Sequence, residues 1–404
     1  MAIALFLLSL LATLALLGWL FILLHPARPW DLLPVAEDIQ PPPDPPAWPG
    51  VCVVVPARNE AAALPQTLPA LLEQDYPGAL RVIVVDDRSS DGTAAAAHEI
   101  AARLNQTARL TVLAGEALPS GWMGKVWAMT QGLRAAAASP PDFVLLTDAD
   151  IHHAPGSLRR LVAESHAAGL GLNSRMARLR CESPAERLLI PAFVYFFNLL
   201  YPMRRANNPA DPLAAAAGGC VLLSWAAVEK MGGTLEAIRA EIIDDVNLAR
   251  QVKGHGFAIR LSLSRTEVRS LRAYERLDDV WKMVRRTAFT ELKYSWARLA
   301  GALAGLALLF GVPPFAIVCG ILGATLQAET TTLVFALWAL GKGMLALAVM
   351  RGVYAPAVRF FELPCHRAWT LPLAGALYGL MTLDSALRHA RGAGVQWREA
   401  APPP

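Results

Sequence analysis

The middle of this 404-residue sequence predicts an α/β fold with a doubly wound, mostly parallel sheet. Short runs of β-branched residues alternate there with helical stretches, and strand-helix-strand order is typical of parallel pairing. The runs hardly alternate between apolar and polar residues, which indicates strands covered on both faces. The predicted strands are 51–56, 81–87, 109–114 and 142–148, and the predicted helices between them are 60–74, 91–104 and 124–138.

Ahead of this domain, residues 1–24 contain no charged side chain and are long enough to cross about 30 Å of hydrocarbon as a helix. We interpret them as a transmembrane anchor. A cleaved signal peptide is the weaker alternative, because no Lys or Arg precedes the apolar run and His25-Pro26 is a poor cleavage site. The proline-rich residues 25–50 predict an extended linker.

Beyond the domain, residues 297–390 are predicted to form two or three membrane helices, and 391–404 a tail. Basic residues precede the first of these helices, so the positive-inside rule places the α/β domain in the cytoplasm. Three full spans would put Arg388 and Arg391 on the opposite side, so one segment is expected to be re-entrant or interfacial. The candidate segments are 299–323, 330–350 and 369–387.

The composition agrees with a membrane protein. Hydrophobic residues make up 54% of the chain and charged residues 17%, against about 25% charged in soluble domains. The net charge of +4 and the lack of a basic stripe argue against nucleic acid binding. The five cysteines are far apart and are interpreted as buried thiols in a reducing compartment.

Acidic and polar clusters follow three of the predicted strands, at the edge where open α/β sheets bind ligands. The first strand ends in Pro56-Ala57-Arg58-Asn59-Glu60, and the second in Asp86-Asp87, with Asp91 soon after. Glu60 could simply complement a helix dipole and Asp91 could be an N-cap. Asp86 and Asp87 end a buried strand, where an unpaired carboxylate is costly, so we expect them to contact a ligand.

The fourth strand ends in Asp148-Ala149-Asp150. Alternate side chains of an extended segment share a face, so both carboxylates can reach one Mg²⁺ or Mn²⁺, with diphosphate oxygens completing the shell. A plain turn is the alternative for this D-x-D. His152 and His153 are interpreted as solvated loop residues, with a third metal ligand as the minority alternative.

Two further segments suit the same site. Gly121-Trp122-Met123-Gly124-Lys125 opens a helix, where glycine amides and one ammonium suit a phosphate, although a plain turn is equally consistent. The segment 241–250 begins another helix with carboxylates in its first turn. The helix dipole alone would favour them, but Asp245 could also supply a general base.

Two stretches mix aromatic and basic residues. The stretch 278–296 predicts an amphipathic helix at the membrane face, with its basic side toward phosphate groups. The stretch 187–205 is consistent either with the same role or with a buried core helix.

Together these motifs resemble family 2 glycosyltransferases of the GT-A fold, over roughly residues 51–296. The resemblance implies that Asp245 is the catalytic base and that Asp148 and Asp150 bind the metal. It implies donor contacts from Pro56, Glu60, Asp86, Asp87, Asp91, Lys125, Asp148, Arg285 and Arg286. Membrane-bound members carry Q/R-x-x-R-W where this chain has Lys282-Met283-Val284-Arg285-Arg286, so Arg286 replaces the tryptophan.

The segments GWMGKVWAMTQG, IIDDVNLARQVKGHGF and WKMVRRTAFTEL look most like hopene-associated glycosyltransferases of bacteria. This resemblance implies an inverting enzyme of the bacterial inner membrane, with a nucleoside diphosphate sugar as donor, by expectation a UDP-sugar, and a hopanoid-type lipid as acceptor. Transfer to a polyprenyl phosphate and a non-catalytic nucleotide-sugar-binding protein are the alternatives.

Overall fold

The computed structural model describes residues 1–326 and 329–392, and the chain divides into two compact units. The helical unit contains Met1–Leu32, Cys181–Pro202 and the C-terminal region from Tyr274 onward. The sheet unit contains Leu33–Arg180 and Met203–Ala273. The predicted linker therefore divides at residue 33, and most of the predicted tail lies outside the described residues.

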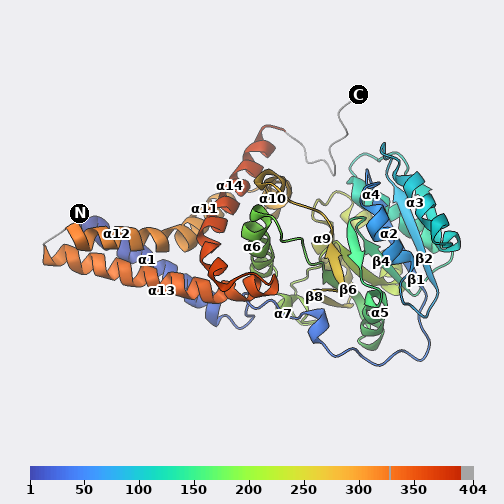
Figure 1. The fold of residues 1–404 in the computed structure, drawn as a ribbon, viewed down its shortest axis with the longest axis horizontal. Coiled ribbons are helices and arrows are strands. Elements are labelled where there is room, and N and C mark those ends of the chain that lie inside the picture. The colour runs from blue at the N-terminus through green and yellow to red at the C-terminus, as the bar shows by residue number, and fades with distance from the viewer. Residues whose placement is uncertain (327–328, 393–404) are drawn as a thin grey trace. The chain divides into compact units, whose positions relative to one another are not determined.

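The sheet unit is built on a seven-stranded sheet in the order β3-β2-β1-β4-β7-β6-β8 (Figure 1). The first four strands are parallel, as predicted. Strand β7 is antiparallel to both of its neighbours, so the sheet is mixed beyond β4. The strands are β1 Val51–Ala57, β2 Leu80–Asp86, β3 Leu110–Ala114, β4 Phe143–Thr147, β6 Leu170–Met176, β7 Cys220–Ser224 and β8 Ala258–Leu263, and a separate pair joins β5 Ile151–His153 to β9 Val268–Ser270.

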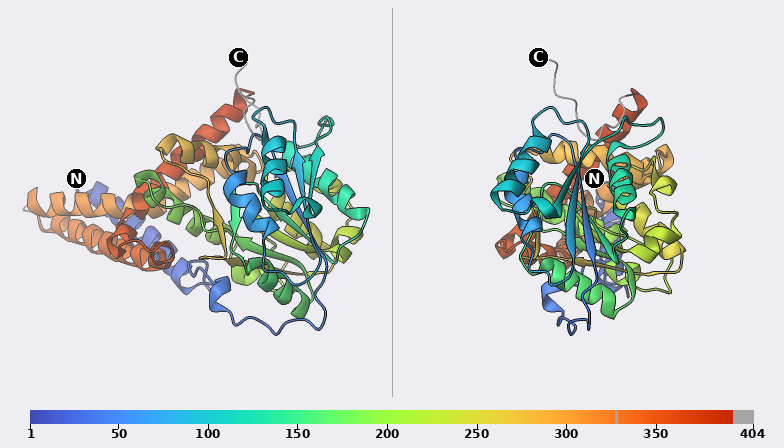
Figure 2. Two further views of the ribbon diagram at one scale, coloured as in Figure 1. Left: turned by 45° about the vertical axis from the view of Figure 1, so that its right-hand side comes forward. Right: turned by 90° about the vertical axis from the view of Figure 1, so that its right-hand side faces the viewer.

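Helices cover both faces of this sheet (Figure 2), because successive residues of its strands serve two different cores. In β1, Val53 and Val55 pack in the core that includes Leu68 of α2, whereas Cys52 and Val54 pack in the core that includes Leu133 of α4. The predicted double cover is confirmed. The helices are α2 Leu64–Leu72, α3 Thr93–Arg103, α4 Gly124–Ala137, α5 Ser157–Ala167, α7 Met203–Ala206, α8 Trp225–Lys230 and α9 Asp244–Gly254.

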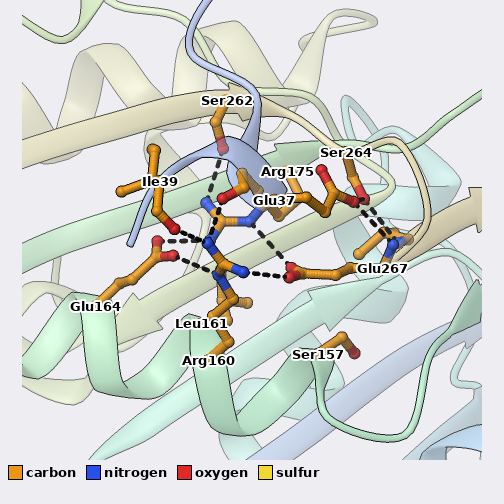
Figure 3. Close-up of polar contacts among 12 residues, drawn as sticks. Glu37, Ile39, Ser157, Arg160, Leu161, Glu164, Arg175, Ser262, Ser264 and Glu267 are labelled. Atoms are coloured by element: carbon orange, nitrogen blue, oxygen red, sulfur yellow. Dashed lines mark hydrogen bonds and ion pairs between the residues drawn. The ribbon is translucent and has the colours of Figure 1, made fainter. Parts of the chain in front are cut away.

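The linker residues that belong to the sheet unit are held by a buried charge cluster, which we define as Glu37, Arg160, Glu164, Arg175 and Glu267 (Figure 3). Arg160 donates to the carbonyl oxygens at positions 36 and 39, and the Glu37 carboxylate accepts backbone N–H groups of residues 265–267. Burial alone would raise the pKa of Glu37, but the N–H groups of residues 266 and 267 lower it to about 2. The linker is thus docked on β8 and α5.

The helical unit contains three helices that are long and apolar enough to cross a membrane, within the described residues. They are Ala2–Leu24, the continuous Trp296–Leu326 and Thr330–Phe360; the second joins α11 and α12 through a π-helical turn. The third candidate predicted from the sequence, now α14, does not qualify. The helices are α1 Ala2–Leu24, α6 Pro184–Leu200, α10 Leu277–Glu291, α11 Trp296–Leu306, α12 Val312–Leu326, α13 Thr330–Phe360 and α14 Leu371–Ala390.

Small residues bring α12 and α13 into close antiparallel contact. A methyl group on Gly320 would lie 2.8 Å from the carbonyl oxygen of Ala336, and one on Gly343 would lie 2.8 Å from that of Pro313. Close approach at small residues is typical of membrane helix pairs. The start of α12 and the end of α13 therefore lie at the same end of this helical hairpin.

All five cysteines are free thiols. Cys52 and Cys220 are buried, as predicted, and Cys181 and Cys319 are partly buried. Cys365 is exposed, which corrects the prediction for that residue, because it lies in a short 3₁₀ turn between α13 and α14 rather than inside a core.

Candidate active site

The predicted acidic clusters lie at one edge of the sheet. Asp86 is the last residue of β2, Asp148 directly follows β4, and Pro56 is the penultimate residue of β1. The strand order β2-β1-β4 makes these three strands neighbours, and all three are parallel, so their carboxyl ends meet. This placement is what sequence reasoning expected of a ligand-binding edge.

Lys125 joins the D-x-D motif to Asp244, the residue that precedes the candidate base Asp245. Its ammonium lies 2.8 Å from Asp148 Oδ1 and 3.3 Å from Asp244 Oδ2. Lys125 is the second residue of α4, and Asp244 is the first residue of α9, so the starts of two helices meet here. Burial alone would lower the pKa of Lys125, but the two carboxylates raise it above its ordinary value. A fixed positive charge thus stands among the acidic residues.

Asp245 completes this cluster, which we call the Lys125 cluster: Lys125, Asp148, Asp244 and Asp245. The N–H group of Gly218 donates to Asp245 Oδ2 at 2.8 Å, and the N–H group of Val246 donates to Oδ1 at 2.8 Å. Burial and the neighbouring charge of Asp244 raise the pKa of Asp245 to about 7, against the opposing effect of Lys125 and the two N–H groups. A carboxyl group that titrates near neutrality suits proton transfer.

Asp150 has a different cationic partner. Its Oδ2 lies 2.8 Å from Nε of Arg272, and another nitrogen of the same guanidinium lies 3.8 Å from Glu60 Oε1. Arg272 therefore links the end of β4 to the turn after β1. Nothing in the sequence indicates this role of Arg272, because it stands 122 positions after Asp150 in a segment without a motif.

Asp87 is 1% exposed and pairs with Arg58, whose Nη1 lies 3.1 Å from its Oδ2. Its other oxygen, Oδ1, lies 3.9 Å from Arg88 Nε but is buried without a hydrogen-bond partner in the described part of the chain. An unsatisfied buried carboxylate oxygen is costly, and a donor group of a bound ligand would relieve it. Arg58 lies inside the quoted PARNE motif, but the sequence analysis gave it no role.

The turns after β1 and β2 are tied to one another. Asn59 donates its N–H to Ser89 Oγ at 2.9 Å, and the Asp91 carboxylate accepts the N–H groups of Ala61 and Thr93. Because α3 begins at Thr93 with Gly92 as its N-cap, Asp91 precedes the cap position that the sequence suggested for it. Asn59 and Arg88 both have a φ of +54°, a conformation that non-glycine residues seldom adopt. The two turns are therefore cross-linked by hydrogen bonds, with one residue of each in an unfavourable backbone conformation.

The oxygen donors of Asp148 and Asp150 fit a divalent cation shared with a ligand. Within residues 1–326 and 329–392, no three His, Cys, Asp or Glu residues form a metal cluster. Mg²⁺ is commonly held by only one or two carboxylates together with substrate phosphates, however. The cations Lys125 and Arg272 already lie at these carboxylates, which shows that the site attracts positive charge.

Of the two histidines next to the D-x-D, His153 serves the fold. The hydroxyl proton of Thr147 is directed to the carbonyl oxygen of Gly219 at 2.7 Å, so Nε2 of His153 donates to Thr147 Oγ1 at 2.9 Å. Burial and the neighbouring His152 lower the pKa of His153 to about 3. His153 is therefore a buried neutral residue, not the solvated loop histidine that was expected, because it lies in β5 and pairs with β9.

Arg285 and Arg286 lie on α10 in the helical unit. Arg285 Nη1 is 3.4 Å from Asp384 Oδ2 of α14, and Arg286 is exposed. Their donor contact stays a prediction.

Comparisons with known proteins agree with this geometry. A family model for "Glycosyltransferase like family 2" matches residues 49–290. Two N-acetylglucosaminyltransferases match part of the chain: one from Mesorhizobium japonicum is 33% identical over 40% of it, and one from Rhizobium leguminosarum bv. viciae is 30% identical over 35%. The matches span 36% and 31% of those relatives' lengths.

Among solved structures, a mannosyltransferase from Pyrobaculum calidifontis in complex with GDP-Man and Mn²⁺ shares the fold, with a TM-score of 0.51 and 20% identity. That similarity covers 96% of this chain and 100% of the other. The family model spans more than half of the chain, including every member of the Lys125 cluster and both carboxylates of the D-x-D. The chain therefore belongs to glycosyltransferase family 2.

Proposed function

We propose that this protein is a membrane-bound inverting glycosyltransferase that moves a sugar from a nucleoside diphosphate sugar to a lipid hydroxyl. The observation that carries the proposal is the Lys125 cluster, in which one ammonium lies within 3.3 Å of carboxylates from the D-x-D and from the start of α9. Leaving-group stabilisation and proton acceptance are the two tasks of such a transfer, and this cluster places groups for both side by side.

The donor side is assigned to the edge formed by β2, β1 and β4. Asp87 Oδ1, which has no hydrogen bond within the described residues and lies 3.9 Å from Arg88 Nε, accepts a hydrogen bond from the nucleoside, while Glu60, Asp86, Asp91 and Pro56 belong to the two turns around it. Lys125 carries a positive charge toward the diphosphate. A divalent cation held by Asp148 and Asp150 would supply Lewis-acid stabilisation of charge on the departing diphosphate. Uridine is the expected base, and the curated relatives suggest an N-acetylhexosamine as the first sugar to test.

Asp245 is assigned as the base. Its carboxylate accepts the proton of the acceptor hydroxyl while that oxygen forms a bond to the anomeric carbon and the bond to the diphosphate breaks on the opposite face. The N–H groups of residues 218 and 246 hold the carboxylate oriented for this step. Binding both reactants in fixed geometry contributes further to the rate.

The acceptor is assigned as a membrane lipid, on the support of three helices able to cross a membrane. A hopanoid-type alcohol is the specific proposal, and it rests on the resemblance of residues 121–132, 242–257 and 281–292 to hopene-associated enzymes. By the positive-inside rule, the basic residues before Trp296 support a sheet unit in the bacterial cytoplasm. A polyprenyl phosphate is the second candidate, because an oxyanion acceptor needs no base.

The test is a donor screen on the purified full-length protein with Mn²⁺ and native membrane lipids. We expect one nucleoside diphosphate sugar to release its nucleotide only when lipid is present, and mass spectrometry to find the sugar on a lipid alcohol. Lipid-dependent transfer that persists in Asp245→Asn would assign a phosphate acceptor. Nucleotide binding without release from any donor would show a binding protein without turnover.

A further inference from the structure

The helical unit gathers basic side chains from two distant segments at one corner. Lys293 and Arg298 lie at the turn between α10 and α11, and Arg388 and Arg391 lie at the end of α14. We define these four residues as the basic corner. All four are exposed, and within residues 1–326 and 329–392 no carboxylate forms an ion pair with any of them. Four free cations at one place form a surface suited to anions.

Aromatic packing holds the two segments together. Phe289 is buried, and its ring lies 5.5 Å from those of Trp296 and His389, measured between centroids. Tyr294 stacks on His389 with 4.4 Å between centroids and 21° between planes. Because His389 directly follows Arg388 in α14, this stack fixes the end of α14 beside the turn after α10. The corner is therefore a built feature and not a chance meeting of flexible side chains.

The turn that carries Lys293 and Tyr294 is itself unusual. Their φ angles are +50° and +54°, in the left-handed region where glycine is normally used. Two large side chains stand in consecutive positions that glycine would fill without strain. Keeping them there has a conformational cost, which is consistent with a role for their side chains.

The corner also lies where a membrane surface is expected. Trp296 is the first residue of the continuous apolar helix that ends at Leu326, and it is 52% exposed, while Tyr294 is 42% exposed. Exposed Trp and Tyr flanking a span are typical of the headgroup region. The antiparallel return of α13 brings the chain back to the same side, and α14 does not qualify as a span. Arg388 and Arg391 thus lie with Lys293 and Arg298, which removes the conflict with the positive-inside rule.

From these observations we propose that the basic corner is a binding surface for anionic phospholipid headgroups at the membrane interface. The occupant is a lipid rather than a soluble anion, because the cations adjoin a membrane-spanning helix and are interleaved with exposed aromatic side chains. Each basic residue near an anionic leaflet favours binding, and this attraction falls off within a Debye length. The proposal does not depend on sugar transfer.

The test uses native mass spectrometry of the full-length protein released from mixed micelles that contain phosphatidylglycerol and phosphatidylcholine in equal amounts. We expect the wild type to retain phosphatidylglycerol preferentially. The variants Lys293→Gln/Arg298→Gln and Arg388→Gln/Arg391→Gln should each lose about thirtyfold of that preference. Two matched variants should keep it: Arg388→Lys/Arg391→Lys, which preserves the charge, and Arg103→Gln/Lys230→Gln, which removes two exposed charges from the sheet unit.

Circular dichroism of each variant confirms that the helices remain folded. Equal retention of the two lipids by the wild type, or an unchanged preference in both glutamine variants, would overturn the proposal. So would loss of bound phosphatidylglycerol on addition of excess inorganic phosphate at constant ionic strength, because that result assigns the corner to a soluble anion.

Discussion

The sheet unit contains two clusters of opposite charges that differ in what satisfies them. In the buried charge cluster, Arg175 and Glu164 are each 1% exposed by side chain, and the Arg175 guanidinium also donates to Ser262 and Asn173. In the Lys125 cluster, Asp148 keeps 35% of its side chain exposed. The first cluster is enclosed by the protein, although Glu37 Oε2 and Arg175 Nε have no hydrogen bond within the described residues, whereas the second exposes the Asp148 carboxylate to solvent. A charge cluster therefore indicates a ligand site only where its charged groups are accessible to solvent.

We expect substitutions in the two clusters to differ most in their effect on the rate of sugar transfer. Asp245→Asn removes the base while keeping the shape of the side chain, so the kcat for transfer to an alcohol should fall by about 10²–10⁴-fold. Release of nucleotide from the donor, measured with the lipid acceptor, checks this result.

The same variant should be at least as stable as the wild type at alkaline pH. Since burial and Asp244 raise the pKa of Asp245 from 3.8 to about 7, the wild type loses stability as the pH rises from about 4 to about 7, and the full penalty is present above pH 7. Thermal unfolding above pH 7 measures this. A variant that loses both stability and activity would place Asp245 with the structural cluster instead.

Breaking the buried charge cluster should act on the stability of the fold rather than on the reaction. Arg175→Met removes the most buried of the cations around Glu164, which keeps Arg160 at 3.1 Å and Arg260 at 3.7 Å, and should lower the free energy of unfolding by about 3 kcal/mol. Arg260→Met is the matched control, because Arg260 lies 3.7 Å from the same Glu164 carboxylate but is 30% exposed, and it should cost at most about 1 kcal/mol. Chemical denaturation measures both. Equal costs would show that burial does not separate these pairs.

A smaller effect is expected where only the geometry of the Lys125 cluster changes. A methyl group on Gly218 would lie 3.2 Å from Lys125 Nζ and 3.4 Å from Asp245 Oδ2. Gly218→Ala should therefore lower kcat by about 10–100-fold, since small displacements at a reacting centre are costly. Gly254→Ala, at the far end of α9 where an added methyl meets nothing within 4 Å, should leave kcat unchanged. Equal rates in the two variants would contradict a packed site at residue 218.

A dependence of the rate on pH is also expected. Asp245 must lose its proton to act as a base, so kcat/KM should rise about tenfold per unit as the pH approaches the pKa of about 7 from below, and then level off. In Asp244→Asn, loss of the neighbouring negative charge should move the midpoint to lower pH. A profile that is flat from about pH 5 to pH 8 would argue against a base of this kind.

Much of this account could be predicted from the sequence, because local patterns determine it. The β-branched runs that hardly alternate predicted four parallel strands, and Asp86, Asp148 and Asp245 were identified by their places at element ends. Arg272 could not be predicted, because its role depends on the pairing of β5 with β9, which brings residues 150 and 271 together. The docking of the linker through Glu37 was missed for the same reason: prolines indicate an extended backbone but not what it contacts.

The central claim is that Asp148, Asp150 and Asp245 act on one donor at one edge of the sheet. The most direct measurement is the anomalous scattering of Mn²⁺ in a structure of the full-length protein with a nucleoside diphosphate. We predict a Mn²⁺ peak within coordination distance of Asp148 or Asp150 and in contact with the diphosphate. The nucleoside should lie near Asp87. A peak at other residues, or a nucleotide bound away from this edge, would contradict it.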